Sequence, residues 1–224
     1  MTSFLLRADG VLRGASWITR SSRPWTATRD LVLCVCLFGL TYGAAMGTFG
    51  GLTGDRPLQV LYSACKVPLL LLGTFLLSLP SFAVINTLFG LRRDLGEAIR
   101  AVVAAQAGVA TVLASLAPFT LLWYVSAVSY QVAILFNAAM FTIASLAGQR
   151  LLRRYYQPLI ARNRRHRVLL RTWIVVYAFV GIQMGWMFRP FIGSPNTPVQ
   201  FFREETWGNA YVIVARLLWQ VIAL

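Results

Sequence analysis

Long runs of uncharged, mostly apolar residues alternate along the chain with short polar connections. A helix needs about 20 apolar residues to cross the hydrocarbon core of a membrane. Residues 31–51 and 67–91 each fit one crossing, whereas 101–149 fits two crossings joined by a turn at 126–129. The pattern predicts an all-α fold, a polytopic transmembrane helical bundle with five spans, at 31–51, 67–91, 101–124, 130–149 and 172–192.

The segments outside these spans mix charged and apolar residues. Residues 1–30 alternate apolar side chains with arginines, which is typical of a helix lying on an anionic cytoplasmic surface; a solvated tail fits the pattern as well. We also expect an interfacial helix at 58–65 and an amphipathic lead-in at 92–100. Residues 193–224 are predicted to form an extracytoplasmic loop and a short interfacial helix, or a partly inserted sixth segment.

Glycines recur at four-residue intervals in the first span, at Gly39, Gly43 and Gly47. Gly50 and Gly54 are expected to continue the same helix face. Small residues at this spacing let membrane helices approach closely. The motif predicts a helix-packing face that meets another span of the chain or, as the alternative, a partner protein.

Composition and charge agree with a membrane protein. Hydrophobic residues make up 58 % of the chain and charged residues 12 %, against roughly 45–50 % and about 25 % in soluble domains. The net charge of +14 comes largely from arginines in 1–30, 92–100 and 150–171. These alternate connections are cytoplasmic by the positive-inside rule, which argues against nucleic-acid binding. We therefore expect a bacterial inner-membrane protein with its N-terminus in the cytoplasm and its C-terminus outside.

Few residues suit chemistry, so we expect no enzyme, cofactor or metal site. The single histidine, His166, stands among arginines in the predicted basic loop 150–171, and no sequence neighbour offers it a carboxylate. We interpret it as a solvated loop residue. Cys34, Cys36 and Cys65 are interpreted as apolar packing residues.

Cations near the spans are the remaining candidates for binding. Lys66 and Arg189 border spans on the same predicted side. We favour snorkelling of Lys66 to the interface; the alternative is that Lys66 and Arg189 together form an anion or lipid-headgroup site. Neutralisation of Arg189 by Glu204 and Glu205 fits the sequence equally well. The other predicted lipid-phosphate contacts, on the cytoplasmic side, are Arg164, Arg165 and Arg167.

Four uncharged polar residues lie within the predicted spans. We interpret them as interhelical hydrogen-bonding groups. They are Asn86, Gln106, Asn137 and Gln183.

The organisation, an Arg-rich N-terminus followed by five closely spaced spans, resembles the Yip1-type membrane proteins. The likeness covers residues 31–192 and includes the stretches YGAAMGTFGG at 42–51, KVPLLLLGTFLLSLPSF at 66–82 and FVGIQMGWMFRPFIGSP at 179–195. The resemblance implies a five-helix membrane domain and a non-enzymatic, membrane-organising or partner-binding role. It implies no functional residue.

These observations lead to two functional hypotheses. The first is an accessory, scaffolding or partner-binding subunit of a larger membrane assembly, in contact with membrane lipids that are anionic on the cytoplasmic side and with other membrane-protein subunits. The alternative is a small permease or channel whose pathway uses Lys66, Asn86, Asn137 and Gln183 around kinks at Pro80 and Pro118.

Overall fold

The computed structural model describes residues 2–15, 18, 24–126, 129–194 and 198–202. These residues form helices and connections without any strand, as the sequence predicts. Among them, five helices are long and apolar enough to cross a membrane. The elements in chain order are α1 (Thr2–Arg13), α2 (Pro24–Gly47), α3 (Arg56–Leu88), the 3-10 helix η1 (Arg92–Asp94), α4 (Leu95–Ser126), α5 (Tyr130–Arg162) and α6 (Arg165–Met187).

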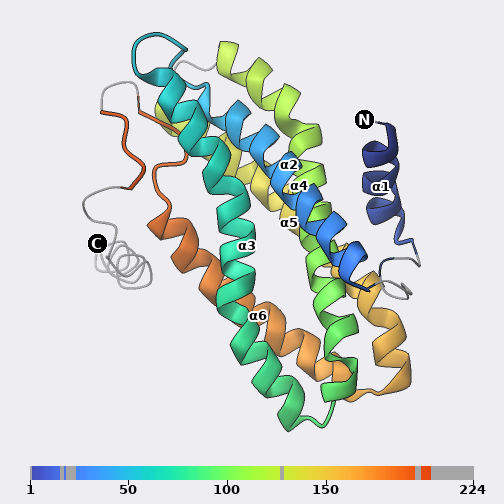
Figure 1. The fold of residues 1–224 in the computed structure, drawn as a ribbon. Coiled ribbons are helices and arrows are strands. Elements are labelled where there is room, and N and C mark those ends of the chain that lie inside the picture. Colours follow the sequence, from blue (N-terminus) through green and yellow to red (C-terminus); the bar gives the residue numbers. More distant parts are fainter. Residues whose placement is uncertain (1, 16–17, 19–23, 127–128, 195–197, 203–224) are drawn as a thin grey trace, which may run out of the picture.

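The bundle is built around α2 and α4 (Figure 1). α2 packs against α3 and α4, α4 packs against α5, and α6 packs against α3. Every residue from Ala101 to Gly108 in α4 is buried, because this stretch is rich in alanine and glycine and neighbouring helices can approach it from several sides.

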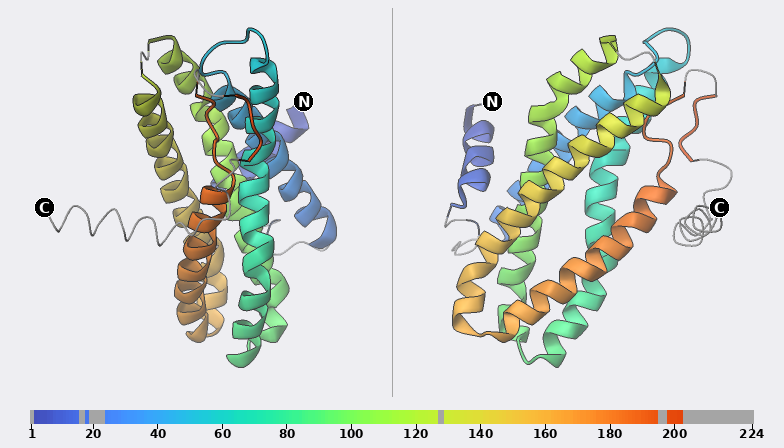
Figure 2. Two further views of the ribbon diagram at one scale, coloured as in Figure 1. Left: turned by 90° about the vertical axis from the view of Figure 1, so that its left-hand side faces the viewer. Right: turned by 180° about the vertical axis from the view of Figure 1, so that it is seen from behind.

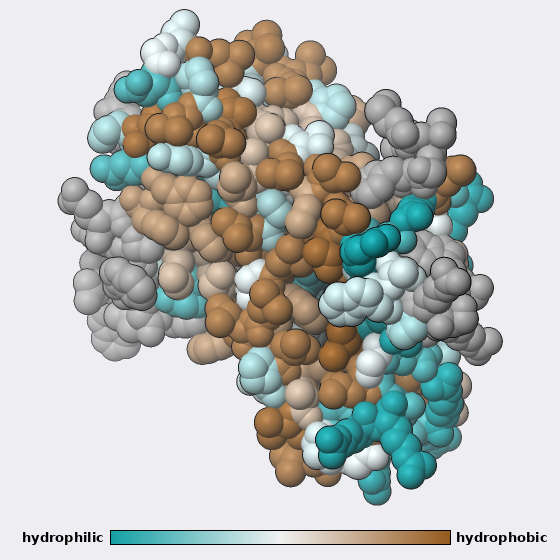
Figure 3. Space-filling model, in the orientation of Figure 1, coloured by the Kyte–Doolittle hydropathy of each residue, from teal (hydrophilic) through white to brown (hydrophobic). Residues whose placement is uncertain are grey.

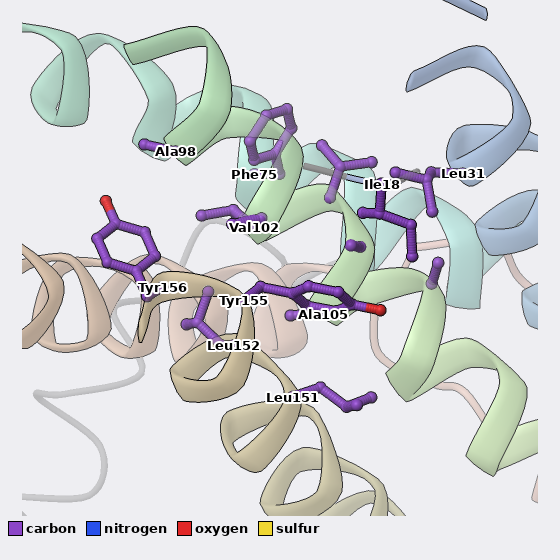
Figure 4. Packing of buried hydrophobic residues seen from close by; sticks show 14 of the residues in the cluster. Ile18, Leu31, Phe75, Ala98, Val102, Ala105, Leu151, Leu152, Tyr155 and Tyr156 are labelled. Carbon is purple, nitrogen blue, oxygen red and sulfur yellow. The ribbon is translucent and has the colours of Figure 1, made fainter. Parts of the chain in front are cut away.

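A core cluster joins α4 to α3 and α5 (Figure 4). Val102 and Ala105 of α4 pack in this cluster with Leu151 and Leu152 of α5 and with Phe75 of α3. The following tyrosines of α5, Tyr155 and Tyr156, belong to the same cluster and point to different sides of the helix in Figure 4. Since these aromatic residues are buried, α5 continues well past the predicted end of its span at residue 149.

The N-terminal helix α1 lies beside the bundle (Figure 1). Val11 is buried, and its carbonyl accepts a hydrogen bond from the Tyr155 hydroxyl. Arg7 forms an ion pair with Asp30, close to the start of α2. Packing and electrostatics therefore hold α1 against the side of α4 and α5.

Helix boundaries differ from the prediction at several places. α2 begins at Pro24 rather than at 31, and α4 begins at Leu95 rather than at 101. α3 is continuous from Arg56, so the separate interfacial helix at 58–65 is wrong. The basic segment 150–171 is mostly helical rather than a loop, because α5 ends at Arg162 and α6 begins at Arg165. α6 ends at Met187 rather than at 192.

The predicted break within 101–149 is confirmed. α4 ends at Ser126 and α5 begins at Tyr130, and the Ser129 hydroxyl at the helix N-terminus accepts a hydrogen bond from the Val132 amide. The connection between α5 and α6 is shorter. There, Asn163 Oδ1 accepts a hydrogen bond from the amide of Arg165, the first residue of α6.

Apolar side chains cover much of the outer surface (Figure 3). Leu77 on α3, Leu135 on α5 and Phe179 on α6 are each about 60 % exposed or more. Such an exposed apolar surface fits contact with lipid rather than with water. Hydrophilic residues gather at the lower right of the view, toward the end of the bundle at which α5 meets α6.

Candidate binding cavity between α5 and α6

α5 and α6 meet at the 163–164 turn and diverge toward the opposite end of the bundle (Figure 2, right). A cavity of about 400 Å³ lies between them, with α3 and α4 behind. It is lined by Leu70, Leu71 and Thr74 from α3; Val102, Ala105, Gln106 and Val109 from α4; Phe141, Ser145, Gly148, Gln149 and Leu152 from α5; and Trp173, Ile174, Tyr177, Ala178, Gly181 and Ile182 from α6.

The cavity has a buried floor and an exposed rim. The floor residues from α3 and α4 include Thr74, Val102 and Gln106, all of them buried. Ser145 on α5 and Ile182 on α6 are exposed at the rim. The opening therefore lies on the side of the bundle between two apolar helices.

Three polar side chains, those of Thr74, Gln106 and Tyr177, line the floor. Gln106 Nε2 donates a hydrogen bond to the Tyr177 hydroxyl at 3.1 Å. Gln106 Oε1 and Thr74 Oγ1 are buried and have no hydrogen-bond partner. An unpartnered buried polar atom costs about 1–3 kcal/mol, so these two atoms mark a place where a ligand or water would gain hydrogen bonds.

A second cavity of about 510 Å³ adjoins the first, and the two share Leu70 and Phe141 as lining residues. Its wall includes Arg189 and Asn137. The Asn137 amide is fully engaged, because Oδ1 accepts from the Tyr42 hydroxyl at 3.0 Å and Nδ2 donates to Tyr124 at 2.6 Å. The interpretation of Asn137 as an interhelical hydrogen-bonding group is therefore confirmed.

The segment that follows α6 folds back onto a polar face of α3. Lys66 Nζ donates to the Pro190 carbonyl at 2.6 Å and lies 4.9 Å from the centre of the Phe201 ring. One turn earlier, Ser63 donates to the Phe191 carbonyl. We call this set of contacts the α3 clamp. It explains why α3 has no break at 58–65: its polar side chains are paired inside the protein.

The two cations of the predicted anion site have different surroundings. Lys66 is fully buried in the α3 clamp and lines neither cavity, so the expected snorkelling to the interface is wrong. Arg189 lines the second cavity, with its guanidinium 3.1 Å from the centre of the Trp186 ring. Glu204 and Glu205, the predicted neutralising residues, lie outside the described residues, as does the predicted helix at 209–224.

The predicted glycine face is used within the chain. A Cβ atom on Gly39 would meet Pro68 of α3 at 3.2 Å, and one on Gly47 would meet Val60 Cα at 2.6 Å. Gly43 faces the backbone of Ser63 and Ala64 in the same helix. These three glycines thus bring α2 into backbone contact with α3.

Gly50 and Gly54 do not extend this face, and that part of the prediction is wrong. α2 ends at Gly47. Both glycines lie in the connection to α3 with positive φ, at 91° and 62°. Glycine suits these positions because residues with a Cβ rarely adopt this conformation.

At the opposite end of the bundle, His166 is fully buried. Its Nε2 lies 3.0 Å from Asp94 Oδ2, and Tyr156 packs against its ring. The interpretation as a solvated loop residue without a nearby carboxylate is wrong, because folding brings Asp94 to it from 72 positions away in the sequence.

The neighbouring arginines remain on the surface. Arg164, Arg165 and Arg167 are exposed, and Arg165 also donates to the Phe89 carbonyl at 3.3 Å. Among the described residues, no group of three or more His, Cys, Asp or Glu side chains is arranged to hold a metal ion.

Sequence reasoning singled out Gln106, as an interhelical hydrogen-bonding group, but missed Thr74 and Tyr177. Hydroxyl side chains are common in membrane helices, so neither residue carries a distinctive signal.

Comparison of the chain with protein-family models, with curated proteins and with solved structures finds no match.

Proposed function

We propose that this membrane protein acts by binding: it holds a lipid-like molecule in the cavity between α5 and α6 and serves as an accessory subunit of a membrane assembly. The observation that carries the proposal is the cavity itself, which opens on the side of the bundle and has buried polar atoms at its floor. Its volume of about 400 Å³ lies within the roughly 300–1,000 Å³ typical of small-molecule sites.

The location of the polar residues favours binding over transport. The permease hypothesis requires Lys66, Asn86, Asn137 and Gln183 along one pathway. Asn137 lines the second cavity, but Lys66, Asn86 and Gln183 line neither cavity, and Lys66 is part of the α3 clamp. Pro80 and Pro118, the predicted kinks of that pathway, are exposed on the outside of the bundle.

We further propose that the protein lies in the bacterial inner membrane with its N-terminus in the cytoplasm. The exposed arginines of 164–167 would then contact anionic lipid headgroups at the inner surface. The proposed role as an accessory subunit is non-enzymatic, in line with the Yip1-type resemblance.

Two glycines on one face of α6 provide a matched test. Gly181 lines the cavity, and a Cβ there would sit 3.5 Å from Thr74 Cγ2, an ordinary contact. Gly185 lies one turn later with open space around it and lines neither cavity. Gly181→Leu fills the cavity, whereas Gly185→Leu adds the same side chain outside it.

Each protein is extracted from its native membrane in a mild detergent, and mass spectrometry identifies what remains bound in fixed ratio through size exclusion. We expect the wild type and Gly185→Leu to retain a small amphiphile that Gly181→Leu loses. Equal retention by all three contradicts the proposed site. A protein companion in fixed ratio supports the accessory role, whereas a lone species in several detergents favours the permease.

A further inference from the structure

The floor of the cavity constrains the chemistry of what binds there. Gln106 is 4 % exposed and Thr74 is 2 % exposed, so bulk water does not satisfy their polar atoms. Gln106 Oε1 is a hydrogen-bond acceptor, whereas the Thr74 hydroxyl can either donate or accept. The Tyr177 hydroxyl accepts a hydrogen bond from the Gln106 amide and can donate a hydrogen bond of its own. A fitting ligand group therefore donates to Gln106 and can also accept.

The charge of the cavity gives a second constraint. None of the residues that line it is charged. An ionised head group at this depth would lose its hydration without gaining a counter-charge, which is strongly unfavourable. The second cavity, with Arg189 in its wall, is where an anion would be favoured instead.

The remaining lining gives the third constraint. Apart from the polar floor, the walls are mainly Leu, Val, Ile and aromatic side chains, and the opening faces the apolar flank of the bundle. A molecule that enters from the bilayer can therefore place a polar end on the floor while its chain extends out between α5 and α6.

We infer that the occupant is an uncharged membrane amphiphile with a hydroxyl head group, which donates a hydrogen bond to Gln106 Oε1 and pairs with the Thr74 and Tyr177 hydroxyls. The inference rests on the proposed function, since it specifies the ligand of the same cavity. A hydroxyl fits because it is the smallest neutral group that both donates and accepts.

Three probes with the same chain test the head group: hexadecan-1-ol, hexadecyl methyl ether and hexadecanoate. Each is titrated into the purified, delipidated protein in detergent, and the rise in thermal unfolding temperature reports binding to the folded state. We expect hexadecan-1-ol to bind the wild type, and the ether, which cannot donate, to bind about tenfold more weakly. Hexadecanoate should be as weak as the ether.

Variants separate this inference from the proposed function. Gln106→Leu should bind the alcohol and the ether equally. If Gln106→Leu fails to fold, Thr74→Val replaces it in the test. Thr74→Val removes the second polar atom and should reduce the preference for the alcohol over the ether. If the ether or hexadecanoate binds the wild type as tightly as the alcohol and Gly181→Leu abolishes that binding, the head-group inference fails and the cavity remains. If no probe raises the unfolding temperature of the wild type, both the head-group inference and the proposed site fail.

Discussion

Gln106 on α4 and Tyr177 on α6 are joined across the bundle by a hydrogen bond of 3.1 Å, although 71 positions separate them in the sequence. The bond links the central helix to one wall of the cavity and orients the Gln106 amide so that its oxygen remains without a partner. One contact thus contributes both to helix packing and to the proposed binding site.

The energetic value of this bond can be measured in a double-mutant cycle. Gln106→Leu and Tyr177→Phe each remove one partner, and the double variant removes both. Because interhelical hydrogen bonds in membranes average about 0.6 kcal/mol, we expect a coupling energy of that order in reversible unfolding from mixed micelles. Strict additivity of the two single changes would show that the bond does not contribute.

We call the backbone contact of Gly39, Gly43 and Gly47 with α3 the α2–α3 seam. It predicts that the same substitution has different effects on stability at two glycines. In Gly43→Ala the new methyl group meets the backbone of Ser63 and Ala64, which cannot move aside as a flexible side chain can. We expect a loss of about 1–3 kcal/mol, as for other overpacked sites. Gly185→Ala, with open space around it, should be neutral or more stable. Thermal unfolding in detergent compares the two, and equal stability would contradict the seam.

The α3 clamp predicts that Lys66 holds the segment after α6 in place. Lys66→Met removes the donor to the Pro190 carbonyl, and a hydrogen bond to a charged group is worth about 1.5–3 kcal/mol. A cysteine at Ile192, which is 4 % exposed, in a background lacking the native cysteines, reports opening by its thiol-labelling rate.

We expect the labelling rate at this cysteine to rise by roughly 10- to 100-fold in Lys66→Met. The control is Leu69→Met on the exposed side of α3, which should leave the rate unchanged. An unchanged labelling rate in Lys66→Met would show that Lys66 does not hold the segment after α6 in place. Lys66 would then again be a candidate for anion binding.

The buried contact between His166 and Asp94 predicts a stabilising role at the α5–α6 turn. His166→Leu removes the 3.0 Å contact with Asp94 and leaves its carboxylate with one fewer partner, so we expect a loss of about 1–3 kcal/mol. Arg164→Ala, two residues earlier and exposed, should change stability by no more than about 0.5 kcal/mol. Tryptophan fluorescence during thermal unfolding in detergent measures the stability of both variants. Equal losses in His166→Leu and Arg164→Ala would argue against a stabilising contact between His166 and Asp94.

The sequence predicts the number of long helices well because each uncharged run has to satisfy the length of a crossing. It predicts the helix ends poorly. α3 and α5 extend beyond their apolar runs because polar residues on the extensions are paired elsewhere: Ser63 and Lys66 with carbonyls after α6, and Arg162 with Glu97 at 2.7 Å. Such pairs join residues far apart in the chain and leave no local pattern.

The cavity was also beyond prediction from the sequence. It exists because α5 and α6 diverge from their shared turn, and no periodicity in either helix specifies that angle. Gln106 stands out as a polar residue in an apolar run, yet its role depends on Thr74 and Tyr177 from two other helices. Conversely, the glycine face at Gly39, Gly43 and Gly47 could be read directly, because close backbone contact needs small residues at helical spacing.

Photo-crosslinking at two adjacent positions of α6 tests the central claim most directly. Ile174 lines the cavity, whereas Val175 is 68 % exposed on the outside. A diazirine side chain is placed at one position or the other, native membranes are irradiated, and the mass added to the protein is measured. The account predicts one dominant lipid-sized adduct at 174 and a mixture reflecting the bulk membrane at 175. The same mixture at both positions, or insertion of water at 174, would contradict it.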